Sequence, residues 1–80
     1  MIDIATQKPV RVLDEPGSRA HLTVRGEQVE PILKALQDKG IACWQVGGIL
    51  SIDGAPGLGF IAIGINESAA KAQAVLDAVP

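Results

Sequence analysis

Two side chains in this sequence belong to types that commonly perform catalysis near neutral pH, the single histidine and the single cysteine. His21 lies in an alternating stretch that predicts an exposed strand position, and a histidine acts as an acid or base only beside a positioned partner. Cys43 is predicted on the core side of its strand, where a thiol is an inert small hydrophobe. The two fall on opposite predicted faces, so no Cys–His pair is expected.

Metal and phosphate chemistry find little support in the residue types. One histidine and one cysteine cannot complete a closed metal site. The glycine-rich stretch over residues 53–59, DGAPGLG, matches neither the G-x-G-x-x-G nor the G-x-x-x-x-G-K-[ST] spacing. It also leads into a strand and not into a helix N-terminus, where phosphate would bind. We therefore interpret it as a turn and expect neither a cofactor nor a metal.

The composition is that of one small domain that can form a core. The chain has 80 residues, of which 48% are hydrophobic, and a net charge of −2 with scattered basic residues. This charge pattern contains no cluster of basic residues of the kind that binds nucleic acid. Glycines, Asp53 and Pro56 interrupt the apolar region over residues 40–66, so no membrane span is expected. The unpaired cysteine and the absence of a signal peptide favour a cytoplasmic protein.

Hydrophobic periodicity predicts the elements that must position these residues. We expect residues 1–8 to be a loose leader and residues 9–80 to form a single α+β domain. The predicted strands cover residues 10–13, 20–25, 41–46, 49–53 and 58–65. One predicted helix covers residues 26–39, with a regular start delayed by Pro31. The other is capped by Asn66 and runs to about Val79.

The pair Gly47-Gly48 is predicted to form a two-residue type I′ hairpin turn. This register sets Val46 opposite Ile49 and Trp44 opposite Ser51, and it places Cys43 opposite Ile52.

Two helix ends then orient the predicted sheet. Gly40 and Ile41 fit a Schellman motif in which Ile41 packs on Leu36, and Ile65 is placed to pack on Ala70. The residues expected on the helix side are Leu22, Val24, Ile41, Cys43, Leu50, Ile52, Ile61, Ile63 and Ile65. The residues expected on the opposite face are Trp44, Val46, Ile49, Leu58, Phe60 and Ala62, beside His21, Thr23 and Arg25.

The predicted order over residues 20–79, strand, helix, hairpin or meander, strand, helix, resembles the ferredoxin-like arrangement. Small ligand-sensing ACT-type domains are one version of it. We thus expect an antiparallel sheet of about four to five strands with two helices on one face. The resemblance implies a further edge strand after the second helix, and residues 10–13 are a candidate for that edge. It concerns topology alone and carries little functional information.

The hypothesis that follows is a small non-enzymatic interaction module. Large apolar surfaces are usually covered by a partner, and two helices cannot cover both faces of the sheet, so we expect a homodimer formed through the open sheet face. The candidate interface residues are Trp44, Val46, Leu58, Phe60 and Ala62. One alternative is an ACT-like small-molecule sensing domain with ligand beside His21, Thr23 and Arg25. Another is a small enzyme or enzyme subunit that uses Cys43 or His21.

Overall fold

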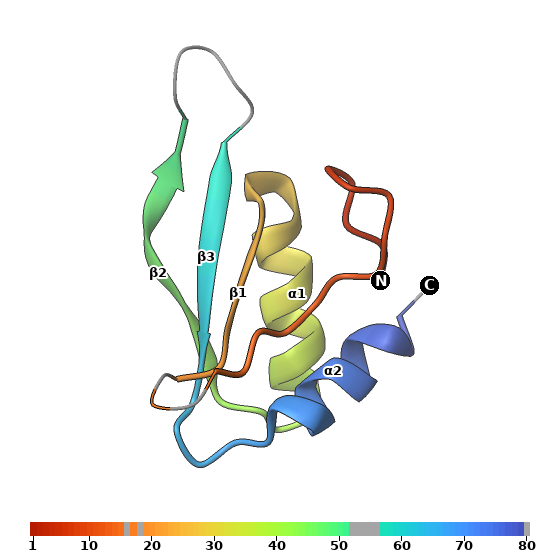
Figure 1. The fold of residues 1–80 in the computed structure, drawn as a ribbon, viewed down its shortest axis with the longest axis vertical. Coiled ribbons are helices and arrows are strands. Elements are labelled where there is room, and N and C mark those ends of the chain that lie inside the picture. Colours follow the sequence, from red (N-terminus) through yellow and green to blue (C-terminus); the bar gives the residue numbers. More distant parts are fainter. Residues whose placement is uncertain (16, 18, 52–56, 80) are drawn as a thin grey trace.

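The computed structural model describes residues 1–15, 17, 19–51 and 57–79. Its elements follow the order β1 (His21–Arg25), α1 (Gly26–Asp38), β2 (Cys43–Leu50), β3 (Leu58–Ile63) and α2 (Ala69–Asp77). The strands form one antiparallel sheet in the order β1-β3-β2, and both helices lie on the same side of it (Figure 1). The α+β class expected from the sequence is confirmed.

The sheet has three strands within the described residues, which is fewer than the four or five expected. Residues 10–13 meet it only through an isolated bridge between Leu13 and His21. Pro9 has no N–H, and the N–H of Val12 donates to the side chain of Gln73 at 2.8 Å. The segment therefore cannot continue a regular ladder along β1.

The predicted hairpin at Gly47-Gly48 is wrong, because both glycines lie inside β2. A type I′ turn needs positive φ at both central residues, whereas only Gly47 has it, with φ of 66°. Val46 pairs with Phe60 and Leu50 pairs with Leu58, so the residues between Val46 and Leu50 form a bulge against β3. No separate strand begins at Ile49, and residues 52 and 53 of the predicted strand lie outside the described residues.

Helix α1 begins at Gly26, earlier than Pro31 led us to expect. Its other end matches the prediction. The N–H of Ile41 donates to the carbonyl of Leu36 at 3.0 Å, and the N–H of Gly40 donates to that of Gln37 at 2.9 Å. Gly40 has φ of 76°, so these contacts form the Schellman motif, which is confirmed.

Helix α2 is capped by Ser68 and not by Asn66. The hydroxyl of Ser68 accepts a hydrogen bond from the N–H of Lys71 at 3.2 Å. Asn66 lies instead in a turn that the N–H of Glu67 closes on the carbonyl of Gly64, at 2.9 Å. That turn leaves Ile65 77% exposed, so its predicted place on the helix side is wrong. Ile61 and Ile63 are fully buried there, as expected.

The core lies between the helices and the sheet and extends to the N-terminal segment. Its main members are Val10, Leu22, Val24, Val29, Ile32, Leu36, Ile41, Cys43, Ile61, Ile63, Ala72 and Leu76. Residues 1–8, which we expected to be a loose leader, make hydrogen bonds to the helices. The side chain of Gln28 in α1 donates to the carbonyl of Ile2 at 2.8 Å and accepts from the N–H of Ile4 at 3.1 Å.

Candidate functional site

The face of the sheet turned away from the helices carries most of the residues singled out in the sequence. Side chains directly opposite each other in a sheet point to the same face, so the register arranges them in rows. The three rows are Trp44–Ala62–His21, Val46–Phe60–Thr23 and Leu50–Leu58–Arg25. We call the apolar surface formed by Trp44, Val46, Leu50, Leu58, Phe60 and Ala62 the open-face patch.

Leu50 and Ile49 exchange the places that the hairpin register gave them. Leu50 pairs with Leu58 on the open face and is 57% exposed, so its predicted core position is wrong. Ile49 packs toward the helix side, since a Cβ built on Gly26 or Gly59 would meet its side chain at 2.9 or 3.1 Å. Simple alternation from Cys43 to Leu50, with no turn at the glycines, would have found Leu50.

The outer part of the open-face patch is the exposed part. Trp44 is 42% exposed and Val46 is 49% exposed, and Leu58 is exposed as well. Farther along the same central strand as Leu58, Phe60 is half-buried and Ala62 is buried. The patch is therefore a continuous apolar surface with its largest free side chains on β2.

Positive charge borders the patch along β1. The guanidinium of Arg19 lies 5.0 Å from the centre of the Trp44 ring, a cation–π contact that the sequence did not predict. The Nδ1 atom of His21 lies 3.0 Å from the carbonyl oxygen of Arg19. The Nε atom of Arg25 is buried and has no hydrogen-bond partner among the residues that the structure describes. The three strands contain no acidic residue to balance the charges of Arg19 and Arg25.

Cys43 lies on the other side of the sheet and is buried. Burial raises the pKa of its thiol, a hydrogen bond with Gln37 opposes this rise, and the charge of Glu67 adds to it. The thiol is thus kept in its less nucleophilic, protonated form. His21 is on the opposite face and on the other outer strand, so the structure does not bring these two residues together.

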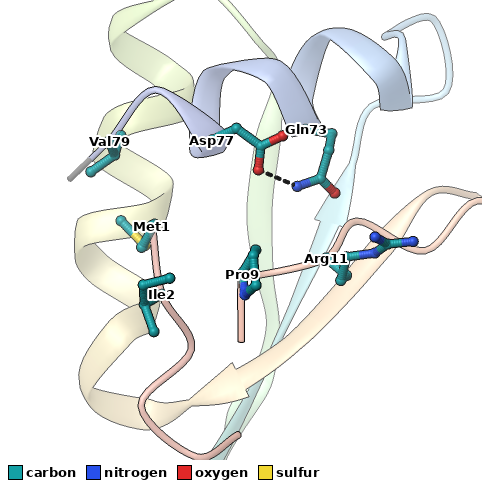
Figure 2. A pocket seen from close by; sticks show the side chains of 7 residues that line it. All are labelled: Met1, Ile2, Pro9, Arg11, Gln73, Asp77 and Val79. Carbon is teal, nitrogen blue, oxygen red and sulfur yellow. Dashed lines mark hydrogen bonds between the residues drawn. The ribbon is translucent and has the colours of Figure 1, made fainter. Parts of the chain in front are cut away.

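A hollow of about 490 Å³ lies between the N-terminal segment and α2 (Figure 2). It is lined by Met1, Ile2, Pro9, Arg11, Gln73, Asp77 and Val79. The amide of Gln73 bonds to the carbonyl of Val10 at 2.8 Å, to the N–H of Val12 at 2.8 Å and to Asp77 at 2.9 Å. The Gln73 amide, a polar group in the lining of this hollow, is therefore already used to hold the N-terminal segment.

Within the described ranges, no three histidine, cysteine or acidic side chains gather as metal ligands would. Nor does any helix in that part of the chain have the length and hydropathy to cross a membrane. No protein-family model, curated protein or solved structure matches this chain. The open-face patch with its cationic border is the exposed apolar surface on which we base the proposed function.

Proposed function

We propose that the chain is a small non-enzymatic interaction module that homodimerises through the open-face patch. The observation that supports this most is the register, which gathers six apolar side chains on the face that neither helix covers. Exposed patches of this kind on a small protein mark interaction sites, and buried aromatic side chains dominate their energetics. Trp44 and Phe60 are the anchors that we propose for the dimer.

The charges on the face favour one arrangement of the two copies. A two-fold axis parallel to β3 places β1 of each copy over β2 of the other. The Arg25 side chains then lie at opposite edges of the interface and do not repel each other. A two-fold axis across the strands would instead stack β1 on β1 and bring like charges together, which is unfavourable.

The size of the face sets the expected affinity. Three strands about 4.8 Å apart and about 20 Å long give a face of about 14 by 20 Å. The area of this face is below the roughly 800 Å² that each partner buries in a standard interface. We therefore expect a weak dimer with a dissociation constant in the micromolar range.

The proposal includes two finer points. The order β1-β3-β2 with both helices on one side supports a ferredoxin-like arrangement that lacks one edge strand. The single cysteine, which cannot form an internal disulfide, supports a cytoplasmic location.

The test is sedimentation velocity from about 5 to about 500 μM, a range that brackets a micromolar dissociation constant. We expect the wild type to shift from monomer to dimer and Val46→Glu to remain monomeric, because a carboxylate would be buried at the interface. Ile65→Glu is the matched control, since Ile65 is an exposed apolar residue outside the patch. A wild type that stays monomeric throughout would rule out the dimer, and equal losses in both variants would rule out this face.

A second candidate is an ACT-like domain that senses a small anionic molecule beside His21, Thr23 and Arg25. The observation that favours it is the buried Nε of Arg25, for which the described part of the chain supplies no hydrogen-bond partner, because a buried cationic donor without a partner is costly. A thermal-shift screen with carboxylate and phosphate metabolites tests it, since a ligand that binds the native state must raise the melting temperature. No shift for any of them would count against sensing.

A further inference from the structure

The outer edge of β1 has unpaired backbone groups. The N–H of His21 donates to the carbonyl of Leu13 at 3.0 Å, and the carbonyl of His21 accepts from the N–H of Leu13 at 2.8 Å. The backbone groups of His21 thus point away from β3. Alternate residues of a strand direct their backbone groups to the same edge. Thr23 therefore turns its N–H and carbonyl outward, and Arg25 turns its N–H outward.

The N-terminal segment leaves these groups uncovered. It lies beside the start of β1 and diverges from the strand toward its other end (Figure 1). Its pairing with β1 ends at the Leu13–His21 bridge, and no backbone bond to Thr23 or to the N–H of Arg25 comes from any other described residue. A hollow of about 320 Å³ opens at this place and is lined by Asp3, Thr6, Lys8, Pro9, Arg11, Leu13 and Thr23.

The charge around this hollow is mainly positive. Lys8 and Arg11 line it, and Arg25 ends the strand that borders it. No ion pair involves any of these three cations in the residues that the structure describes. Asp3 is the one acidic residue in the lining, and its carboxylate already accepts a hydrogen bond from the N–H of Ala5 at 2.7 Å.

The outer edge of β2 is a poorer acceptor of an added strand. Its backbone is irregular around Gly47 and Gly48, where the register against β3 shifts. Bulges of this kind protect edge strands from pairing with other chains. The carbonyl of Cys43 on this edge also accepts a hydrogen bond from the side chain of Gln37, at 3.3 Å.

From the free backbone groups, the adjoining hollow and its unpaired cations, we propose that β1 binds an extended acidic peptide of a partner protein. The peptide adds a strand beside Thr23 and Arg25, in the manner of β-augmentation. Backbone hydrogen bonds supply part of the affinity, and acidic side chains contact Lys8 and Arg11. The site lies on the edge of the sheet and leaves the open-face patch free.

The test uses an eight-residue capped peptide of alternating valine and glutamate, followed by amide NMR and hydrogen exchange. We expect the peptide to slow exchange of the Thr23 and Arg25 amides at least about tenfold, because these N–H groups become hydrogen-bonded. Exchange at Gln45 on β2 should stay unchanged. Absent protection at Thr23 and Arg25 would overturn the proposal, and so would protection centred on β2.

Variants and a second peptide separate the contributions. Thr23→Pro removes an outward N–H that the fold does not use, and it should weaken binding at least about tenfold. Gln45→Pro is the matched change on the other edge and should bind like the wild type. The second peptide has lysine in place of each glutamate. It should bind at least about tenfold more weakly than the glutamate peptide, and equal binding would overturn the acidic assignment. Val46→Glu should retain the site, so failure of the dimer and failure of this proposal are distinguishable.

Discussion

At the scale of single residues, Gly59 determines how closely α1 can approach β3. A Cβ at this position would lie 2.2 Å from the Cγ2 atom of Val29, far inside van der Waals contact. The helix and the strand can therefore pack as they do only because residue 59 has no side chain.

We expect Gly59→Ala to lower the free energy of unfolding by about 1–3 kcal/mol, the usual cost of overpacking. Urea denaturation measures it. Gly48→Ala is the control, because a Cβ there meets nothing within 4 Å. Adding Val29→Ala to Gly59→Ala should recover part of the loss. An unchanged stability for Gly59→Ala would contradict the close packing.

Cys43 should make stability depend on pH in the alkaline range. Burial raises the pKa of its thiol, so the folded protein keeps this proton at pH values where the unfolded chain loses it. The unfolded state then binds fewer protons, and stability falls as pH rises above the ordinary thiol pKa of about 8.5. The stability contribution is fully present below that pH. Denaturation at a series of pH values should show a smaller decline for Cys43→Ala than for the wild type, and equal slopes would refute it.

At the scale of elements, helix α2 begins after Ser68, which caps it in place of the predicted Asn66. Ser68 accepts the hydrogen bond from Lys71, and Asn66 lies in the preceding turn. We expect Ser68→Ala to destabilise the protein by about 1 kcal/mol and Asn66→Ala to have little effect. Thermal unfolding of the two variants decides this, and the reverse order would place the cap at Asn66.

The elements that the sequence predicted well are those set by local pattern. The apolar spacing of α1 and the glycine at its end define that helix, and alternation places Leu22 and Val24 on the buried side of β1. The hairpin turn predicted at Gly47-Gly48 is wrong because a glycine pair suits both a turn and a bulge. Pairing with β3, which is far along the chain, decides between them, and no local signal reports it.

The same reasoning applies to the candidate site. Alternation alone indicates that Trp44, Val46, Leu58, Phe60 and Ala62 share a face, and the register agrees with this, while their role in an interface stays a prediction. The predicted hairpin assigns Leu50 and Ile49 to the wrong faces, because it reverses the alternation of side chains after Val46. Arg19 was missed because it precedes β1 in a segment without periodicity, where only the folded chain brings it over Trp44.

At the scale of the whole molecule, Gln73 joins the N-terminal segment to α2. Its side chain satisfies the carbonyl of Val10 and the N–H of Val12. Gln73→Leu leaves both groups without these partners, so we expect a loss of about 1–3 kcal/mol and faster exchange of the Val12 amide. Lys71→Leu, at an exposed position of the same helix, is the control. Unchanged exchange at Val12 would show that the segment is held by packing alone.

Gln28 and Gln73 attach the N-terminal segment through uncharged amides. Ionic strength screens interactions between charges and has little effect on neutral hydrogen bonds. Acid and mild alkali do not titrate an amide either. These two attachments should therefore persist in concentrated salt and mild acid, under conditions that weaken the cationic contacts on the sheet. If the proposed recognition of a partner holds, salt should release that partner without loosening these amide bonds.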